Sequence, residues 1–394
     1  MLRRALVLCV LVLVLTPLTP LPPGTVVAGI EPAAPPGTRF VSAGDPAVYQ
    51  LVPAGGAPRD RPAGAPRPAV RDIPGFPAPN VLTRYGSRLY VSNYVDLYFG
   101  YLQVVDISVP GGEFITGVIT APVNTFDLAA VDDRLYAVGQ AHAELYELPL
   151  AGGDWISTTL QKSTSDVVEY GHLLYPNGGL MYVNHPHENV IDVVDLAART
   201  VVTTLTGFEY YPARIAFAGD YFVVVENGLN LPDCASYGPH YSVYRLSDHS
   251  QVLRQSIQGD CPMDVVTRGS RLYIVFLNGV KEYDLLSGQV LGQLSFFPAG
   301  WHALSTGREL IVQQYWDGAL YLVDYDLTHI MTTYGLITPP NYWTPPIEEM
   351  VAMPVFTDGR VFVTNRDNSA LSIVDLPLGS VWQHWLPYSV RRGT

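Results

Sequence analysis

Charged residues are scarce in this chain, and acidic residues outnumber basic ones. Only 15% of the 394 residues are charged, and the formal net charge is −13 at pH 7. Arginine greatly outnumbers lysine, and no part of the sequence forms a basic stripe that could neutralise a phosphate backbone. The charge balance therefore argues against nucleic acid as a partner.

Sequence motifs of common enzyme chemistries are also missing. No glycine-rich phosphate loop follows an expected strand, no Gly-x-Ser-x-Gly nucleophile elbow is present, and no Cys-x-x-Cys-His haem site occurs. Nor does any stretch show the sustained apolar period of about 3.6 residues that marks a helix. These absences indicate an all-β chain without an evident catalytic signature.

The N-terminus lacks an apolar run long enough to span a bilayer, but it has a shorter one. Arg3 and Arg4 precede an uninterrupted apolar stretch over residues 5–15, which has the length of a signal-peptide core. The small residues of Val26-Val27-Ala28 offer a cleavage site. We expect residues 1–28 to be a signal peptide and the protein to be secreted, periplasmic or at the cell surface. An uncleaved anchor, the one expected route to a membrane, remains the alternative.

Cysteine is rare, with three residues in the chain. Cys9 lies within the apolar run of the expected signal peptide, so the mature chain keeps Cys234 and Cys261. An even pair of cysteines in an oxidising compartment favours a disulfide bond. Two unpaired thiols are the alternative.

Residues 29–75 are rich in proline, alanine and glycine, which predicts an extended N-terminal segment and linker. Within it, residues 39–52 contain a possible pair of strands that faintly echoes the rest of the sequence. This pair would either add strands where the ends of the domain meet or form an incomplete eighth unit.

A repeated sequence motif fills the remainder of the chain, residues 76–394. Seven times, an apolar run is followed by a turn, an aliphatic-aromatic strand, a variable loop, and a strand that closes on aspartate or its like. Its clearest copies combine residues 88–93 with 103–106 and residues 360–365 with 372–375. A repeat of about 45 residues with four strand signals is typical of a propeller blade. The sequence therefore predicts a seven-bladed β-propeller of four-stranded antiparallel blades.

The second strand of the repeat resembles the YVTN-type propeller repeat. The likeness rests on Tyr90-Val91-Ser92-Asn93, on Phe362-Val363-Thr364-Asn365, and on Met181-Tyr182-Val183-Asn184 followed by Val193-Val194-Asp195. The resemblance implies a secreted, periplasmic or cell-surface propeller with seven blades. It implies no shared catalytic residues.

Aligning the copies places one residue of each inner strand at the mouth of the central channel. This expected ring consists of Asn80, Asp127, Asp166, Arg214, Asp264, His302 and Met353. The residues two positions further along share the same face of each strand and are all apolar. They are Leu82, Ala129, Val168, Ala216, Val266, Leu304 and Val355. We therefore expect a polar bowl above an apolar plug.

Two interpretations of this polar ring stay open. Asp127, Asp166, Asp264 and His302 have the oxygen and nitrogen ligands to hold a divalent cation, or the groups to act as acid and base. Alternatively, such residues accept hydrogen bonds from loop amides and tie neighbouring blades together. No other cofactor is expected.

A weaker metal candidate is the segment that contains His185, His187 and Glu188. Its spacing matches no established zinc motif, and Pro186 directs the two imidazoles apart. A solvated loop is the alternative interpretation.

Aromatic residues gather in loops on the face that is expected to carry the cysteines. We expect five of them to bind a ligand together with Asn80 and Arg214. They are Tyr94, Tyr211, Trp301, Tyr315 and Trp316. Exposed aromatic rings stack on sugars and pack against peptides. The alternative is that these rings only seal the gaps between blades.

These observations favour an exported binding or scaffold propeller. Its expected ligand is a glycan, a peptide or a partner protein, bound through the loop face that carries Cys234 and Cys261. The alternative is a lactonase-like hydrolase or lyase with a cation-assisted acidic and histidine site at the channel mouth. The absence of a nucleophile motif favours the binding role.

Overall fold

The computed structural model describes most of the chain from residue 70 onward, together with two earlier strands. The described ranges are the backbone of 39–42 and 48–52, and residues 70–94, 100–139, 144–160, 173–185, 188–227, 238–257, 261–295, 300–306, 309–314, 319–328, 330–335, 354–365 and 369–376. The expected signal peptide, residues 1–28, lies outside them.

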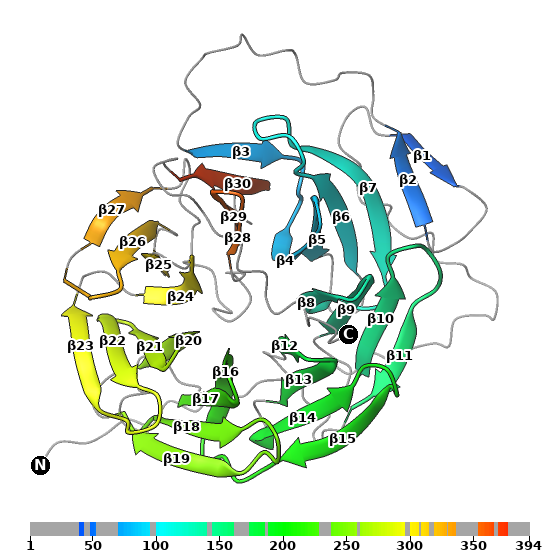
Figure 1. Cartoon of the computed structure of the whole chain (residues 1–394). Helices are drawn as coiled ribbons and strands as arrows, with labels where there is room; N and C mark the ends of the chain where they lie inside the picture. The colour runs from blue at the N-terminus through cyan, green and yellow to red at the C-terminus, as the bar shows by residue number, and fades with distance from the viewer. Residues whose placement is uncertain are drawn as a thin grey trace, which may run out of the picture. The chain divides into compact units, whose positions relative to one another are not determined.

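Seven antiparallel sheets surround a common axis as the blades of a propeller (Figure 1). In each blade the first strand in the repeat lies nearest the axis and the following strands lie successively further out. This confirms the predicted all-β propeller with seven four-stranded blades. The described residues hold no helix long and apolar enough to cross a membrane.

The strands follow the repeat closely. Blades one to three consist of β4 (Pro79–Tyr85), β5 (Arg88–Tyr94), β6 (Gly100–Asp106) and β7 (Phe114–Ala121); β8 (Thr125–Val131), β9 (Arg134–Gly139), β10 (Glu144–Pro149) and β11 (Ile156–Thr159); and β12 (Leu174–Asn177), β13 (Leu180–His185), β14 (Val190–Asp195) and β15 (Thr200–Leu205).

Blades four to six have the same order. They consist of β16 (Tyr211–Ala218), β17 (Tyr221–Asn227), β18 (His240–Arg245) and β19 (Gln251–Ser256); β20 (Pro262–Arg268), β21 (Arg271–Phe276), β22 (Gly279–Asp284) and β23 (Val290–Ser295); and β24 (Gly300–Ser305), β25 (Glu309–Gln314), β26 (Leu320–Asp324) and β27 (Ile330–Tyr334).

The seventh blade joins the two ends of the described chain. It consists of β28 (Val355–Thr357), β29 (Arg360–Asn365), β30 (Ala370–Asp375) and β3 (Val70–Pro74), and β3 pairs with β30 as the outermost strand. The ring therefore includes residues 70–74, which the sequence pattern assigned to the linker. A strand that precedes the repeat region thus completes a sheet built by the end of that region.

The possible strand pair within residues 39–52 forms β1 (Arg39–Ser42) and β2 (Val48–Val52), which pair with each other. β2 continues the sheet of the first blade, with Val48 opposite Ile119 and Tyr49 opposite Val118 of β7. These two strands extend blade one, so they do not form an eighth blade.

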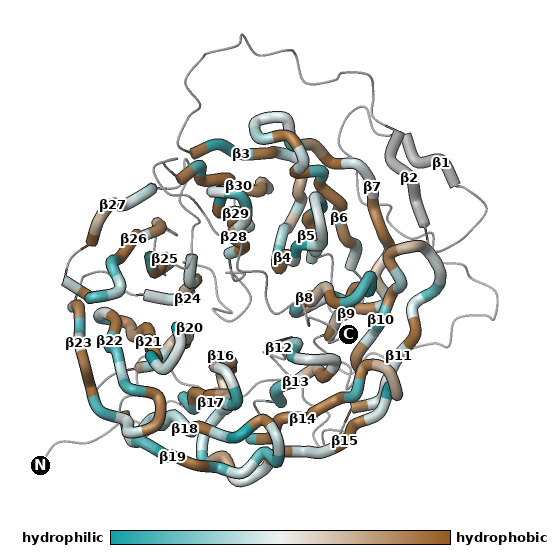
Figure 2. The backbone as a smooth tube through the Cα atoms, viewed as in Figure 1, coloured by the Kyte–Doolittle hydropathy of each residue, from teal (hydrophilic) through white to brown (hydrophobic). Residues whose placement is uncertain are grey.

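Apolar side chains fill the spaces between blades. Tyr182 of β13 and Phe222 of β17 are both fully buried, and their ring centroids lie 5.2 Å apart across the boundary of blades three and four. Burying such a side chain contributes about 1.5–3 kcal/mol. Hydrophobic residues recur along the strands of every blade (Figure 2). The core is therefore a set of layers between neighbouring blades.

The closing aspartate of the repeat caps a turn. The Asp195 carboxylate accepts the backbone N–H groups of Ala197 and Ala198 at 2.9 and 2.8 Å. The next residue, Leu196, donates its N–H to the carbonyl of Gly179 in the turn between the first two strands. The same backbone bond recurs from Ile107, Leu150, Leu246, Leu285 and Leu376. The repeated sequence motif thus forms two turns that are joined by a backbone hydrogen bond.

An asparagine near the end of the second strand links blades. The Asn184 amide donates to the carbonyl of Pro212 in the next blade at 2.9 Å, and its oxygen accepts the N–H of Leu173. Asn227 donates to the carbonyl of Pro262 at 3.1 Å across the following boundary. This explains physically why the repeat uses a polar residue at a buried strand end.

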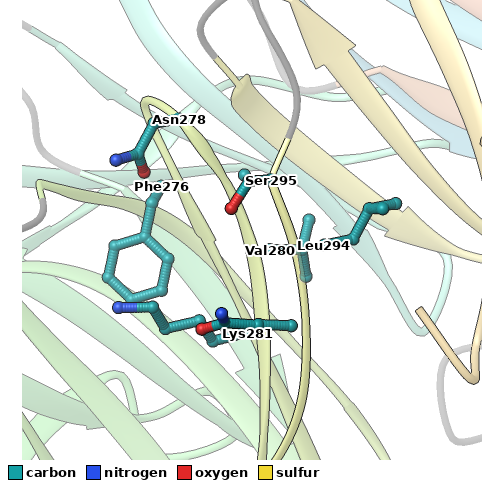
Figure 3. A pocket seen from close by; sticks show the side chains of 8 residues that line it. Phe276, Asn278, Val280, Lys281, Leu294 and Ser295 are labelled. Atoms are coloured by element: carbon teal, nitrogen blue, oxygen red, sulfur yellow. The ribbon is translucent and has the colours of Figure 1, made fainter. Parts of the chain in front are cut away.

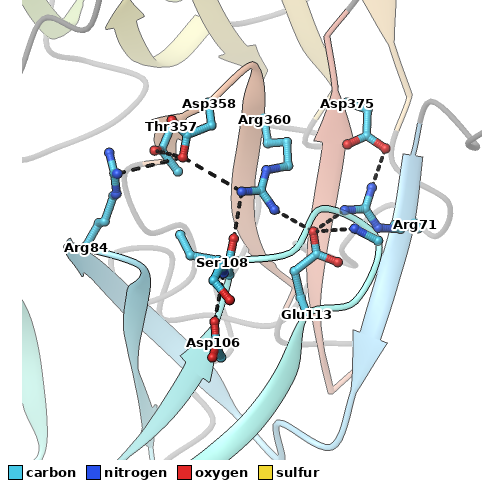
Figure 4. A network of polar contacts seen from close by, with 11 residues as sticks. Arg71, Arg84, Asp106, Ser108, Glu113, Thr357, Asp358, Arg360 and Asp375 are labelled. Atoms are coloured by element: carbon cyan, nitrogen blue, oxygen red, sulfur yellow. Dashed lines mark hydrogen bonds and ion pairs between the residues drawn. The ribbon is translucent and has the colours of Figure 1, made fainter. Parts of the chain in front are cut away.

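Charged groups close the seam between blades seven and one (Figure 4). Glu113, which precedes β7, accepts hydrogen bonds from Arg71 of β3 at 2.5 Å and from Arg360 of β29 at 2.6 Å. Arg71 also pairs with Asp375 of β30. The seam therefore combines strand pairing with buried ion pairs.

Candidate site at the channel mouth

The described inner strands converge on the central channel (Figure 1), and five of them share a local irregularity. In β8, β16, β20 and β24 the pairing register shifts directly before the polar residue of the expected ring. β4 has a similar shift between Pro79 and Leu82. A bulge re-aims the following side chain. The bulge therefore orients the polar side chain near the start of these five strands. The sequence pattern did not reveal these bulges.

Antiparallel pairing defines the face on which this site lies. The inner strands begin at the same end of the blades at which the second strands end. We call this end the mouth face. It includes the positions of Asn80, Asp127, Arg214, Asp264 and His302.

Asp264 is almost completely buried, with 1% of its surface exposed. One carboxylate oxygen accepts the N–H of Val265 at 2.7 Å, and the other accepts the N–H of Ala303 in blade six at 2.9 Å. The second oxygen also lies 3.4 Å from Nδ1 of the buried His302. Asp264 thus connects blades five and six.

Asp127 of blade two repeats this arrangement three blades away from Asp264. Its oxygens accept the N–H of Leu128 and the N–H of Leu174 in blade three, both at 2.8 Å. Burial raises the pKa of Asp127 to about 6, although the two N–H groups and Arg214 act in the opposite direction. The carboxyl group therefore changes its charge between mildly acidic and neutral pH.

Asn80 also connects blades. Its amide donates to the carbonyl of Thr125 in blade two at 3.2 Å, and its own carbonyl accepts the hydroxyl of Thr364 in blade seven at 3.0 Å. Three members of the expected ring therefore hold neighbouring blades together.

Arg214 interacts with both of these aspartates, Asp127 and Asp264. Its Nε atom is 3.7 Å from Asp264, and one Nη donates to the carbonyl of Ala213. The guanidinium also interacts electrostatically with Asp127 and Tyr175. Its side chain is 15% exposed, so it places a largely buried positive charge beside the Asp264 carboxylate.

Tyr175 is a member of this cluster that the sequence pattern missed. The inner strand of blade three is Leu174–Asn177, whereas the alignment of repeats expected it at residues 166–168. Tyr175 thus replaces Val168 among the residues below the mouth, and its hydroxyl donates to the carbonyl of Ala213 at 3.3 Å. Burial raises the pKa of this phenol. The plug is consequently not wholly apolar.

The other expected mouth residues and several loop candidates lie outside the described residues. They are Asp166, Met353, His187, Cys234, Tyr315 and Trp316. Cys261, at the beginning of blade five, is disulfide-bonded.

His185 is the last residue of β13 and is fully buried, so it does not lie in a solvated loop. Its Nε2 atom lies 3.2 Å from a carboxylate oxygen of Asp192, whose other oxygen accepts the hydroxyl of Thr204 at 2.6 Å. Within the described ranges, no three histidine, cysteine, aspartate or glutamate side chains are grouped so that they could hold a metal ion.

The described candidate aromatics lie at strand ends and are partly exposed. Tyr94 ends β5, Tyr211 begins β16, and Trp301 is the second residue of β24. Trp301 packs against Cys261 and against Met263. Nearby on blade four, Tyr210 and His240 are stacked with ring centroids 6.0 Å apart. Trp301, Tyr210 and His240 are therefore held by packing while part of their surface faces solvent.

No family model matches this chain, and no curated protein matches it. Among solved structures, hydrazine synthase of Kuenenia stuttgartiensis is 15% identical with a TM-score of 0.61, over 78% of this chain and 97% of that chain.

Two further structures are similar over comparable lengths. The computationally designed protein Ika8 is 12% identical with a TM-score of 0.53, over 76% of this chain and 96% of that chain. BamB from Moraxella catarrhalis is 10% identical with a TM-score of 0.50, over 75% of this chain and 83% of that chain. The structural similarity shows that these proteins share the propeller fold. At sequence identities this low, it shows nothing about a shared ligand or reaction.

Proposed function

We propose that this chain is an exported propeller that binds a glycan, a peptide or a partner protein through its mouth face. One observation supports a binding or scaffold role above all. The carboxylates that could perform chemistry, Asp127 and Asp264, each accept one N–H from their own strand and one from the next blade. Their hydrogen bonds serve to hold the ring closed.

A general acid or base must exchange a proton with a substrate that reaches hydrogen-bonding distance. Both oxygens of Asp264 are already within hydrogen-bonding distance of backbone amides, and the residue is 1% exposed. This geometry suits a structural role better than proton transfer. Recognition therefore depends on the groups around the mouth.

The described aromatic residues supply such groups. Trp301 is anchored by Cys261 and Met263, and Tyr210 is anchored by stacking on His240. A ring that is fixed before binding loses little conformational entropy when a ligand contacts it. Rigid, partly exposed rings at the mouth face thus support recognition of a sugar or a peptide.

We further propose that the disulfide partner of Cys261 is Cys234 and that residues 1–28 direct export. The bonded state of Cys261 and the resemblance to the YVTN-type repeat support this assignment. A thiol assay on the exported, denatured and unreduced protein should detect no free sulfhydryl. One or more reactive thiols per chain would contradict it.

The binding proposal is tested with the purified mature chain on a glycan array and a peptide array. We expect Trp301→Ala and Tyr211→Ala to weaken a captured ligand at least tenfold. Phe114→Ala is the matched control, because Phe114 is a 43% exposed aromatic at the start of β7, on the opposite face. Equal losses for all three variants, or no loss for the first two, would contradict the proposal.

A second function, a lactonase-like hydrolase or lyase, is favoured by one observation. Burial raises the pKa of Asp127 to about 6, so this group can carry a proton near neutral pH. A lactone substrate panel tests it with the unmodified protein and with Asp127→Asn. Turnover that survives the substitution, or no turnover at all, would exclude Asp127 from catalysis.

A further inference from the structure

Two arginines from neighbouring blades contact one buried carboxylate on the face opposite the mouth face. Glu147 of β10 is 3% exposed. Arg199, in the turn before β15, donates to both oxygens of Glu147, from Nε at 3.1 Å and from one Nη at 3.0 Å. Arg134, the first residue of β9, pairs with the same Oε1 oxygen that this Nη contacts. The two guanidinium groups therefore lie beside each other across the boundary between blades two and three.

This group combines two positive charges with one negative charge. Within the described ranges, neither Arg134 nor Arg199 forms an ion pair with another carboxylate. Both arginine side chains are 40% exposed, so a ligand in solution can reach them. A guanidinium has five N–H donors, and Glu147 takes two of those of Arg199. Donors for a further oxyanion therefore remain.

The same local arrangement in blade five has a single arginine. Glu147 lies opposite Tyr136 in the pairing of β9 with β10. Glu282 lies opposite Tyr273 in the pairing of β21 with β22, so it holds the equivalent position. Its arginine partner among the described contacts is Arg271, the first residue of β21, at 3.0 Å. One arginine thus suffices to neutralise this carboxylate, and the second arginine at blade two leaves a positive charge in excess.

An exposed apolar side chain lies next to the two arginines. Ile156 of β11 is directly opposite Glu147, so the two side chains share one face of the sheet, and Ile156 is 38% exposed. Asp132, in the turn before β9, is exposed and acts electrostatically on Tyr136, as both arginines do. In the described part of the chain it forms no ion pair with them, so solvent screens its charge.

We propose that this site binds the sulfate ester of a sugar. A sulfate ester carries a single negative charge, which equals the excess charge of the site, whereas a phosphate monoester carries about 1.5–2 negative charges at pH 7. Its three terminal oxygens accept from two guanidiniums at different angles, whereas one arginine fork already satisfies the two oxygens of a carboxylate. Ile156 provides an apolar contact for the sugar ring. This site lies on the face opposite the mouth and so goes beyond the proposed function.

Glucose 6-sulfate is the probe, and NMR signals of the arginines report its binding. The Nε–H group of Arg199 is hydrogen-bonded to Glu147, which slows its exchange with water and makes its signal observable. We expect glucose 6-sulfate to shift this signal in a saturable manner and to leave the backbone amide signal of Arg271 unchanged. Glucose should shift neither signal. Methyl sulfate, which has the same charge without the sugar ring, should bind more weakly.

Substitutions test the contribution of the second arginine, with the affinity read from the backbone amide signal of Arg134. Arg199→Met leaves Arg134 to neutralise Glu147 and should weaken binding of glucose 6-sulfate by about tenfold or more. Arg271→Met is the matched control, because it removes the arginine that pairs with the equivalent carboxylate of blade five. It should leave the affinity unchanged.

Lys281→Met is a second control, for the loss of any positive charge. The Lys281 ammonium lies over the ring of Phe276, 4.9 Å from its centroid, and both residues line a small pocket at the mouth-face end of blade five (Figure 3). This variant should also keep its affinity. If Arg199→Met does not fold, Asp132→Asn replaces it as the test. Removal of this exposed negative charge should strengthen binding, and added salt should reduce the gain.

The proposal fails if glucose or methyl sulfate binds as tightly as glucose 6-sulfate, or if a folded Arg199→Met protein or Asp132→Asn keeps the original affinity. It also fails if either control loses as much affinity as Arg199→Met, because the effect would then come from net charge. Binding of N-acetylglutamate in place of glucose 6-sulfate would assign the site to an acidic peptide and overturn it. Trp301→Ala should not affect this binding, so a failure here leaves the proposed function intact.

Discussion

Glu113 and Arg360 lie 247 positions apart in sequence, and they form a hydrogen-bonded ion pair of 2.6 Å. Both side chains are buried, with 2% and 3% of their surface exposed. Arg360 also donates to the carbonyl of Ile107 at 2.8 Å, so it holds the turn that carries Glu113 (Figure 4). The pair joins the last blade to the first. Its loss would leave the buried Arg360 guanidinium without its nearest carboxylate at the boundary where the ring closes.

Replacing Glu113 by glutamine should destabilise the fold markedly. Removing one partner of a buried ion pair typically costs about 3–5 kcal/mol, and here Arg71 and Arg360 would both lose a partner. We expect a loss of about 3 kcal/mol in the free energy of unfolding, measured by chemical denaturation. Glu209→Gln is the control, because Glu209 pairs with Arg254 but is 60% exposed. A cost equal to that of the control would refute this role for Glu113.

The contribution of Glu113 should also depend on pH. Burial opposes ionisation of this carboxyl, but the N–H of Gly111 and the guanidiniums of Arg71 and Arg360 hold its pKa below the usual value of 4.5. A lowered pKa in the folded state means that the stabilisation is complete above the ordinary pKa and is lost as pH falls through the folded value. The difference in stability between the unmodified protein and Glu113→Gln should therefore shrink below about pH 4. A difference that stays constant down to pH 2 would contradict this.

Asp127 should produce the opposite dependence on pH. Burial raises its pKa from 3.8 to about 6, so the folded protein holds this proton more tightly than the unfolded chain. Its contribution to stability is therefore complete below pH 3.8 and declines as pH rises to about 6. In Asp127→Asn this decline should disappear. The variant should lose about 2 kcal/mol, because one of two buried N–H groups loses its acceptor.

Thermal unfolding of Asp127→Asn and the unmodified protein at pH 4 and pH 7 checks this expectation. Chemical shifts of the Asp127 carboxyl carbon, followed by NMR, provide an independent measurement of the titration. A midpoint at the ordinary value of an aspartate would show that burial does not control this group.

Two glycines with positive φ should differ in their tolerance of alanine. Gly219 has φ +58° and open space around the added Cβ, whereas at Gly279 the Cβ would meet the Leu294 carbonyl at 2.2 Å. We expect Gly219→Ala to cost about 1 kcal/mol from backbone strain. Gly279→Ala should cost considerably more, because the added Cβ has no room beside the Leu294 carbonyl. Equal losses of stability in calorimetry would show that the hairpin adjusts without cost.

Much of the fold was predictable because each blade is encoded locally. The motif that ends in Asp195 and Leu196 contains both its turn cap and the hydrogen bond between its turns. Each copy of the motif in the sequence therefore predicts the same local structure. Ring closure was harder to foresee. β3 is a short strand beside a proline-rich segment, and nothing local indicates that its partner is β30, some 300 positions away.

The candidate site was also predictable only in part. The repeat alignment identified Asp127, Arg214 and Asp264 as residues of the inner strands, where the structure has them. It expected the inner strand of blade three at Asp166, whereas pairing with β13 selects Leu174–Asn177. Two neighbouring apolar runs have the same period, and only the partner strand decides which of them pairs. Tyr175 was missed for this reason.

The sequence alone determined the repeat, the number of blades and the all-β class, because these depend on period, turn residues and apolar patterning within about 45 residues. Tertiary structure decided everything that needs two distant segments. It showed that the carboxylates of Asp127 and Asp264 bind amides of neighbouring blades, that Glu113 pairs with Arg360, and that the Lys281 ammonium lies over the ring of Phe276. Hydrogen bonds and ion pairs act over a few ångströms in space, and position along the chain does not specify that distance.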